Sequence, residues 1–476
     1  MSLASRLRSI PEVACVLDRT AELQSYESDA MTLMRGRPAA VALPLTTAAV
    51  ARIVRLCNEV DVPFLARGSG TGLSGGATPV DGCVLIECAR MNRVLEIDAT
   101  NRTARVQPGV INQHLSDAVA SLGLYYAPDP SSQSACTIGG NIAENSGGPH
   151  TLKHGTTAPH VLSLEVVLPD GEVVELGRPD GQPSGYDLRG VFLGSEGTLG
   201  ITTAATLRLL QVPECVEVLL ASFPDLVRAC RAVSDVIAAG IVPAALEMMD
   251  DRTVALVEAS VYAAGYPRDA GAVLICELDG SAQSVAHERE QVLALCRAAG
   301  AGEVRPAATQ EERLALWRGR KGAFGAMGRL APDLYVHDAV VPRTRLPDVV
   351  EAIRRAAEAH GIQISNILHA GDGNLHPNIS FDHRDAEELE RVRRVGREIL
   401  EICVAAGGVL SGEHGIGLEK RGYMDLLFSE ADLAAMHRVH DAFDPEDRCN
   451  PGKAIPEPRA CTESNPRHRG YGRVEF

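Results

Sequence analysis

The sequence lacks several features that would place it in a simple class. Its 12 cysteines include no C-x-x-C pair, so the chain offers no recognisable ligand set for a structural zinc ion or an iron–sulfur cluster. No apolar run reaches the roughly 18 residues that a membrane-spanning helix needs, and no apolar stretch follows the first arginines as a secretory signal would require. With a net charge of -16 and no dense basic cluster, nucleic acid is not an expected partner.

What is present fits a folded chain of several domains in a reducing compartment. The sequence is 45% hydrophobic and 23% charged, close to the usual globular mix. Its 476 residues suffice for two to four domains of roughly 150 residues each. Cys83, Cys88 and Cys276 lie in apolar, strand-like runs, where reduced thiols pack as small hydrophobic groups. We therefore expect a cytoplasmic protein, attached to a membrane only through partners.

Hydrophobic periodicity divides the chain into regions. A helix is expected at 47–60, a strand at 63–66 and further strands as far as 201–210, whereas longer helices, one of them at 309–329, alternate with strands from residue 216. The expected fold class is α+β. The expected regions are an N-terminal segment at 1–39, a first domain at 40–215, a second domain at 216–420, a C-terminal helical segment at 421–456 and a flexible tail at 457–476.

Three glycine-rich segments lie in the first domain. Residues 70–75 read G-x-G-x-x-G, as in the dinucleotide fingerprint, but Pro79 stands where that motif needs a helix. The segment either presents backbone N–H groups to a pyrophosphate or is a plain flexible loop. Further glycine-rich loops at 137–148 and 194–200 favour the first interpretation, because several such loops in one domain suggest one shared ligand.

Together with Pro108-Gly109 and Pro128-Asp129-Pro130, these loops resemble the FAD-binding domain of the vanillyl-alcohol oxidase/PCMH flavoprotein family. The resemblance implies a two-subdomain PCMH-type FAD-binding domain at 40–215. The first loop contains no histidine of the kind that holds FAD covalently in some members, so we expect non-covalent FAD, with a link through His150 or His154 as the weaker alternative. The residues implied in FAD binding are Arg67, Gly68, Ser69, Gly70, Thr71, Gly72, Gly75, Gly76, Pro108, Gly109, Pro128, Asp129, Thr137, Gly139, Gly140, Asn141, Asn145, Gly147, Gly148, Glu196, Gly197, Gly200 and Ile201.

A group of polar residues surrounds a predicted β-turn in the second domain. If Asp372 and Gly373 are its two central residues, His369 stands directly opposite His376, and Asn378 lies on the same face. The histidine Cβ atoms would then be roughly 4.5–5.5 Å apart, close enough to share a metal ion. Because paired strand histidines are ordinarily structural, the pattern alone leaves both interpretations open.

Glu413 and His414 stand between glycines further along the chain. Glu413 would complete a His-His-Glu ligand set that leaves an open coordination position. With His369 and His376, this pair resembles the C-terminal signature of the FAD-dependent D-2-hydroxy acid dehydrogenases, and the match extends to CNPGK at 449–453. The resemblance implies that His369, His376 and Glu413 bind a divalent metal, zinc or manganese, and that His414 is the catalytic base.

Within this family, the chain is similar to the flavin subunit of glycolate oxidase and its D-lactate dehydrogenase relatives. Residues 243–250 and 317–321 support this likeness, which covers nearly the whole chain and implies an α/β cap domain for substrate. It also implies that Arg320 binds the substrate carboxylate, a planar bidentate task that suits guanidinium; a solvated helix charge is the alternative. Arg320, Asn378 and His414 are thus the candidate catalytic residues.

The expected reaction is the FAD-dependent oxidation of glycolate or D-lactate to the 2-oxo acid, with metal-assisted proton abstraction and hydride transfer to the flavin. Family members that act on a dicarboxylate add a lysine where this chain has Val336 and His337, so D-2-hydroxyglutarate is a weaker alternative. Electrons would leave through a quinone, a cytochrome, or iron–sulfur and second flavin-type subunits. A metal-dependent hydrolase and a non-catalytic FAD-binding subunit are more remote alternatives. Glu196 and Glu247 are either further site residues or buried hydrogen-bonding groups.

Overall fold

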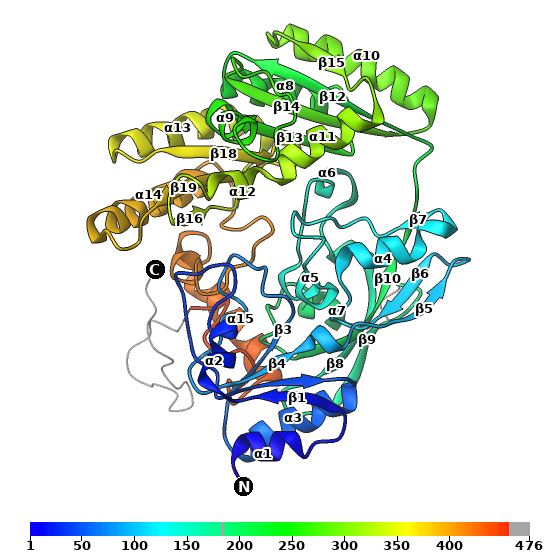
Figure 1. The fold of residues 1–476 in the computed structure, drawn as a ribbon, viewed down its shortest axis with the longest axis vertical. Helices are drawn as coiled ribbons and strands as arrows, with labels where there is room; N and C mark the ends of the chain where they lie inside the picture. Colours follow the sequence, from blue (N-terminus) through cyan, green and yellow to red (C-terminus); the bar gives the residue numbers. More distant parts are fainter. Residues whose placement is uncertain (182–184, 457–476) are drawn as a thin grey trace. The chain divides into compact units, whose positions relative to one another are not determined.

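The computed structural model describes residues 1–181 and 185–456; the tail predicted at 457–476 lies outside these residues. The chain forms two compact units (Figure 1). The first contains residues 1–147, 156–212 and the segment that begins at 413, and the second contains 148–155 and 213–412. No helix among the described residues is both long and apolar enough to cross a bilayer.

The first unit contains two main sheets. The four-stranded sheet has the order β1-β2-β4-β3, in which β4 runs parallel to both β2 and β3, and the five-stranded antiparallel sheet has the order β5-β6-β10-β8-β9. The strands are β1 Val13–Leu17, β2 Ala40–Pro44, β3 Phe64–Arg67, β4 Val84–Glu87, β5 Val94–Asp98, β6 Thr103–Val106, β8 Val161–Val167, β9 Val173–Gly177 and β10 Ile201–Arg208, with the short pair β7 Leu124–Tyr125 and β11 Leu210–Gln211.

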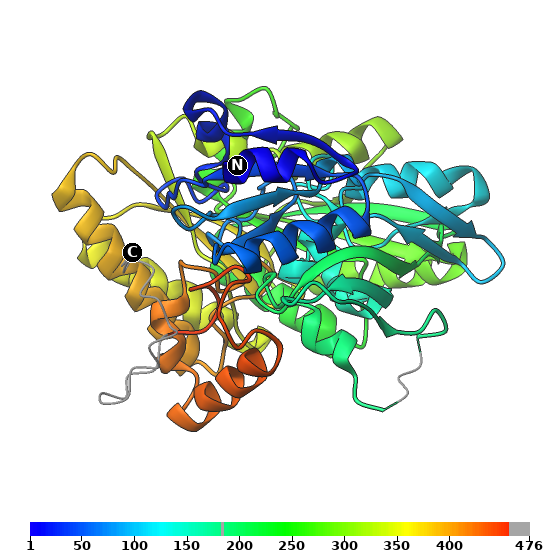
Figure 2. The same ribbon diagram turned by 90° about the horizontal axis from the view of Figure 1, so that it is seen from below.

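The predicted helix at 47–60 is confirmed as α3 (Thr47–Glu59). It begins where the Thr46 side chain accepts the Ala49 N–H at 3.2 Å, and it buries Val50, Ile53 and Val54 at helical spacing. Together with α1 (Leu3–Arg8), it covers one face of the four-stranded sheet (Figure 1), and both helices face the viewer in Figure 2. The unit's other α-helices are α2 Thr20–Leu23, α4 Asn112–Val119, α5 Ile138–Glu144, α7 Leu188–Phe192 and α15 Glu430–Phe443.

The second unit is built on one eight-stranded sheet, β15-β12-β14-β13-β18-β19-β16, with β17 paired to β19. All of its strand pairs are antiparallel, so the alternation of helices and strands comes from an antiparallel sheet, not a parallel one. The strands are β12 Cys215–Phe223, β13 Ala245–Asp250, β14 Ala272–Gly280, β15 Val304–Pro306, β16 Asp333–Val336, β17 Ala339–Val340, β18 Ile364–His369 and β19 Asn374–Phe381. The α-helices are α6 Thr151–His154, α8 Leu226–Ala238, α9 Asp251–Glu258, α10 Ala282–Ala298, α11 Gln310–Lys321, α12 Ala323–Met327, α13 Leu346–Ala359 and α14 Ala386–Ala405.

Two local expectations were wrong. The helix expected at 309–329 is divided into α11 and α12 at Gly322, where an added Cβ would lie 2.3 Å from the Tyr262 ring. The segment at 137–148 is not a continuous loop, because α5 begins after Thr137, whose side chain accepts the Gly140 N–H at 3.3 Å. The mixed α and β composition itself is confirmed.

Candidate functional site

The glycine-rich segments of the first unit surround a cavity of about 690 Å³, open mouth included. Its wall comes from β3 and the loop after it, from α5, and from the residues around the start of β10. The sequence-predicted residues that line it are Arg67, Gly68, Gly76, Pro108, Thr137, Gly139, Gly140, Glu196, Gly197, Gly200 and Ile201. Three separated segments therefore meet at one hollow.

The cavity wall depends on the absence of side chains at particular glycines. A Cβ on Gly68 would lie 2.0 Å from the Thr137 Oγ1 atom, and one on Gly139 would lie 2.6 Å from the Pro108 Cβ atom. The backbone of these loops thus approaches its neighbours too closely for any larger residue. Bare backbone around a hollow suits the pyrophosphate of a dinucleotide cofactor such as FAD, so the residues present fit FAD.

Other sequence-predicted residues shape the loops without lining the cavity. Gly70 and Gly75 have φ angles of +66° and +78°, which favour glycine. Asn141 accepts a hydrogen bond from the Asn112 amide at 3.0 Å. Asn145 ends α5 in the left-handed region. The remaining predicted residues outside the lining are Ser69, Thr71, Gly72, Gly109, Pro128, Asp129, Gly147 and, in the second unit, Gly148.

Sequence reasoning missed Glu144, which lines the cavity together with Glu196. Burial and the nearby charges of Glu196 and Asp29 raise the pKa of Glu144 well above its usual range. Burial also raises the pKa of Glu196, although the N–H groups of Ile416 and Gly417 oppose this by donating to its carboxylate at 2.7 Å each. The available signal was an acidic residue within an otherwise neutral, glycine-rich segment.

The CNPGK segment packs onto the same glycine loops. The Asn450 amide donates to the carbonyl oxygens of Gly76 at 2.9 Å and Glu196 at 2.7 Å. The Lys453 ammonium donates to the Thr78 carbonyl oxygen at 2.8 Å, and burial lowers its pKa to about 8. This segment therefore ties two cavity loops together.

The histidine hairpin of the second unit has a different register from the one predicted. His369 pairs with Asn374, and His376 pairs with Ile367, so the two histidines are diagonal neighbours on one face. Their ring centroids are 5.2 Å apart, and both side chains are buried. The loop between β18 and β19 has four residues, with Gly373 at a φ of +87°. The prediction of directly opposed histidines was wrong, but both rings still lie side by side.

Hydrogen bonds fix the orientation of both rings. The Nδ1 atom of His369 lies 2.8 Å and 2.9 Å from the two carboxylate oxygens of Glu247, and that of His376 lies 2.9 Å from the His337 carbonyl oxygen. Both acceptors favour a proton on Nδ1, which leaves Nε2 as the nitrogen with a lone pair. This second layer of hydrogen bonds is typical of metal-binding histidines, so the donor set fits a metal ion.

Arg320 lies beside this pair as a buried cation. Its Nη2 atom is 2.5 Å from a Glu247 carboxylate oxygen and 3.4 Å from the His369 Nδ1 atom. Its Nε and Nη1 atoms are buried and have no hydrogen-bond partner among the described residues. The expected alternative of a solvated surface charge is therefore wrong. Asn378, by contrast, donates to the carbonyl oxygens of Ser365 and His376.

The remaining predicted residues lie elsewhere in the two units. Glu413 and His414 open the last segment of the first unit, directly after Gly412, which ends the second. His150 belongs to the second unit, where its Nε2 atom is 2.9 Å from a Glu277 carboxylate oxygen and its ring stacks on Trp317.

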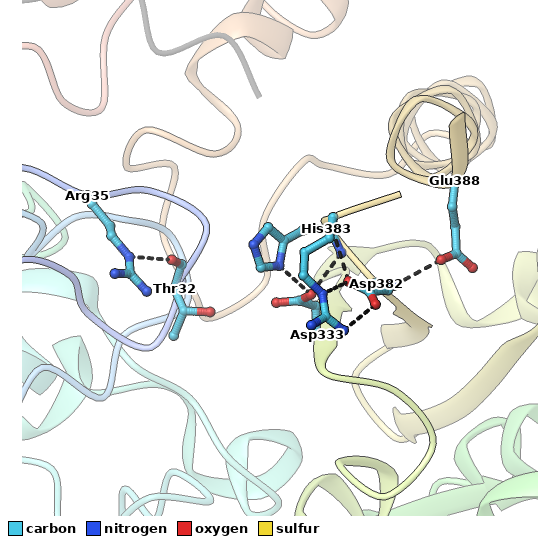
Figure 3. A network of polar contacts seen from close by, with 7 residues as sticks. Thr32, Arg35, Asp333, Asp382, His383 and Glu388 are labelled. Atoms are coloured by element: carbon cyan, nitrogen blue, oxygen red, sulfur yellow. Dashed lines mark hydrogen bonds and ion pairs between the residues drawn. The ribbon is translucent and has the colours of Figure 1, made fainter. Parts of the chain in front are cut away.

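Another histidine of the second unit takes part in an exposed ion-pair network (Figure 3). The His383 ring and backbone N–H contact the Asp333 carboxylate at 2.7 Å and 2.9 Å. Hydrogen bonds from Arg384 lower the pKa of Asp382 to about 2. These residues lie between β19 and α14, and His383 is exposed, so it is a suitable control position for the buried histidines.

Comparison with known proteins shows which protein family the chain resembles. The family model for the FAD binding domain matches residues 38–177, and the model for FAD linked oxidases, C-terminal domain, matches residues 212–454. Two solved structures share the fold at low identity. That of p-cresol methylhydroxylase has a TM-score of 0.80 at 18% identity and covers 95% of this chain and 96% of its own, and that of alkyldihydroxyacetonephosphate synthase has a TM-score of 0.73 at 21% identity, covering 95% and 84%.

Curated relatives match nearly the whole length. Glycolate oxidase subunit GlcD of Escherichia coli (strain K12) is 46% identical over 461 residues, which are 97% of this chain and 92% of that protein. D-lactate dehydrogenase of Anaerostipes hadrus is 33% identical over 441 residues, 90% of this chain and 92% of that protein. The chain therefore belongs to the family of FAD-linked oxidases, and the predicted resemblance is confirmed. Within that family it is an FAD-linked hydroxy acid oxidoreductase.

Proposed function

We propose that the protein oxidises a small D-2-hydroxy acid, glycolate or D-lactate, to the corresponding 2-oxo acid. The observation that carries the proposal is the buried Arg320 guanidinium, whose Nε and Nη1 atoms have no hydrogen-bond partner among the described residues and which lies beside a pair of oriented histidines. Unpaired buried donors on a cation are costly unless a ligand uses them. A substrate carboxylate would satisfy them in a bidentate, charge-assisted contact.

We assign His369, His376 and Glu413 as the residues that would hold a divalent metal ion. The Nδ1 contacts of both histidines support this assignment, and Gly412, the residue before Glu413, lies against Asn374 of the same hairpin, where an added Cβ would be 2.6 Å from the Asn374 amide nitrogen. A divalent ion in such a set polarises a substrate hydroxyl. Zinc and manganese both suit two imidazoles and a carboxylate.

The proposal assigns a role to each of these residues. Arg320 holds the substrate carboxylate, and Glu247 keeps the His369 ring in its tautomer. His414, as the neutral imidazole, accepts the hydroxyl proton on a ring nitrogen. Asn378 supports the hairpin through its bonds to backbone carbonyl oxygens. FAD, non-covalently bound, supplies the hydride acceptor.

The choice between glycolate and D-lactate depends on one methyl group, which a pocket distinguishes by roughly 1–3 kcal/mol. The curated relatives include enzymes named for each substrate. One of them is named as a subunit of glycolate oxidase, so we propose that partner subunits, or a quinone or cytochrome, receive the electrons. Association with a membrane would follow from those partners.

An anaerobic visible spectrum of the purified, FAD-containing protein tests the reaction. We expect glycolate or D-lactate to bleach the flavin bands more readily than D-2-hydroxyglutarate, and a prior chelator to prevent the bleaching. His414→Ala should keep FAD but lose the bleaching, whereas the matched control His383→Ala, at an exposed histidine, should behave as the wild type. Unchanged bleaching in His414→Ala would refute the base assignment, and unchanged bleaching after proven metal removal would refute the metal.

A further inference from the structure

Glu196 holds an unusual backbone conformation in the flavin cavity. Its φ of +53° lies in the left-handed region, which a non-glycine residue keeps only where the surrounding structure enforces it. Both carboxylate oxygens accept backbone N–H groups, from Ile416 and Gly417, at 2.7 Å each. Two donors aimed at two oxygens favour the ionised carboxylate, so Glu196 is the charged member of any pair it forms.

The Glu144 carboxyl group lies beside that of Glu196, between the same two glycines. A Cβ on Gly76 would lie 2.7 Å from one Glu144 oxygen and 3.4 Å from one Glu196 oxygen. A Cβ on Gly415 would lie 2.1 Å and 3.0 Å from oxygens of the same two residues. The Glu144 Oε2 atom is buried and has no hydrogen-bond partner among the described residues. Both side chains also line the cavity.

The other charged groups around Glu144 have partners of their own. The Asp29 carboxylate accepts the Met31 and Ala77 N–H groups at 2.9 Å and 3.3 Å. The Lys420 ammonium is 3.6 Å from a Glu419 carboxylate oxygen, and the Lys453 ammonium donates to the Thr78 carbonyl and Asn450 side-chain oxygens. Asp29 and Glu196 therefore oppose a negative charge on Glu144, and the two lysines offset them only in part.

We propose that Glu144 and Glu196 share one proton, carried by Glu144, and that this carboxyl pair couples reduction of the flavin to pH. The pair holds a single negative charge when Glu144 is protonated and two when it is not. Like charges this close in a buried site cannot both ionise near neutral pH. The proposal rests on the FAD cavity and does not depend on which hydroxy acid is oxidised.

Coupling follows from simple electrostatics. The FAD pyrophosphate is already negative, and a hydride, which is two electrons and one proton, adds a further negative charge to the cavity. An ionised Glu144 opposes that charge, whereas a protonated one does not. Reduction of the flavin therefore raises the pKa of Glu144. Between the Glu144 pKa with oxidised flavin and the higher one with reduced flavin, reduction draws one additional proton from solvent onto Glu144 for every two electrons. The raised pKa of Glu144, due first to burial, agrees with this geometry.

The decisive experiment is the midpoint potential of the bound flavin as a function of pH, measured with a mediator and a chemical reductant so that no hydroxy acid is needed. In the wild type we expect a pH window in which the midpoint potential falls more steeply with pH, by the amount that corresponds to one extra proton for every two electrons. Glu144→Gln, which is neutral at every pH, should lose that window. Glu196→Gln should move it to lower pH, because the charge that raises the Glu144 pKa is removed. Glu172→Gln, at an exposed position before β9, is the matched control and should keep the wild-type profile.

A second measurement needs no flavin. The infrared spectrum of the wild type near pH 8 should contain a protonated-carboxyl stretch that the spectrum of Glu144→Gln lacks. The two spectra should otherwise be alike. Identical potential profiles in the wild type and Glu144→Gln, or no infrared difference between them, would overturn the proposal. If substrate oxidation fails while the potential window is present, the substrate assignment falls and the carboxyl pair stands.

Discussion

The buried Glu247 carboxylate contacts both Arg320 and His369 in the second unit. Glu247 accepts from the His369 ring and pairs with Arg320, and all three side chains are buried. It has two tasks that usually belong to different residues: it balances the charge of the cation and sets the tautomer of the histidine. Removing its charge should therefore affect folding and metal binding together.

We expect Glu247→Gln to lower the free energy of unfolding by about 3–5 kcal/mol, because the Arg320 charge is left buried and uncompensated. Metal affinity should fall roughly 10–100-fold, as it does when second-layer partners of metal-binding histidines are removed. Thermal unfolding and metal content after dialysis against a weak chelator measure the two effects.

The matched control for this change is Glu277→Gln, in the same unit. Glu277 accepts hydrogen bonds from His150 and Trp317 but has no contact with the histidine hairpin among the bonds described above. Its loss should cost stability and leave metal affinity unchanged. Equal metal affinity in Glu247→Gln and the wild type would show that Glu247 does not orient a ligand.

At this residue scale, the sequence could name residues whose chemistry is visible locally. His369, His376, Arg320 and Glu413 stand in recognisable motifs. The role of Glu144 depends on the approach of Gly415 from a segment far away in the chain. Such a contact leaves no local pattern, so sequence reasoning passed over it.

Among the elements, the β18–β19 hairpin shows how tertiary contacts decide a register. A two-residue turn at Asp372-Gly373 was a reasonable prediction, because both residue types favour tight turns. The loop instead has four residues, and an added Cβ on Gly373 would lie 2.1 Å from the Val341 carbonyl oxygen. Packing against this neighbouring segment, which the local sequence does not reveal, accompanies a register shift of two residues. A shift of two keeps every side chain on its predicted face.

Gly373→Ala should therefore destabilise the protein by more than backbone strain alone. Its φ of +87° costs any other residue roughly 1–3 kcal/mol, and the clash with the Val341 carbonyl oxygen adds to this. Gly361→Ala is the matched control, because Gly361 has a φ of +67° and nothing within 4 Å of an added Cβ. Denaturant unfolding of both variants measures the difference. Equal losses of stability would show that the hairpin relaxes away from the contact.

At the scale of the whole molecule, the first unit is assembled from three separated segments of chain. The sequence predicted the helix at 47–60 and the strands at 63–66 and 201–210, because their hydrophobic periods are local. The return of the chain to this unit after residue 412 is not a local property. It is held by bonds from Ile416 and Gly417 to Glu196, and from Asn450 to two cavity loops. Each bond joins residues that are more than 200 positions apart.

This assembly predicts how FAD should stabilise the protein. A ligand at 100 times its dissociation constant adds about 2.7 kcal/mol to every opening that releases it, which slows hydrogen exchange through such openings about 100-fold. FAD should therefore slow exchange in the cavity loops and also at the amides of Ile416 and Gly417, because their acceptor, Glu196, lines the cavity. Amides at the centre of β12 and β14, such as those of Leu219 and Ile275, belong to a different unit and report its own opening. Protection of the cavity loops without protection of the Ile416 and Gly417 amides would mean that the last segment opens independently of the flavin. Glu196 would then line the cavity without coupling that segment to FAD binding.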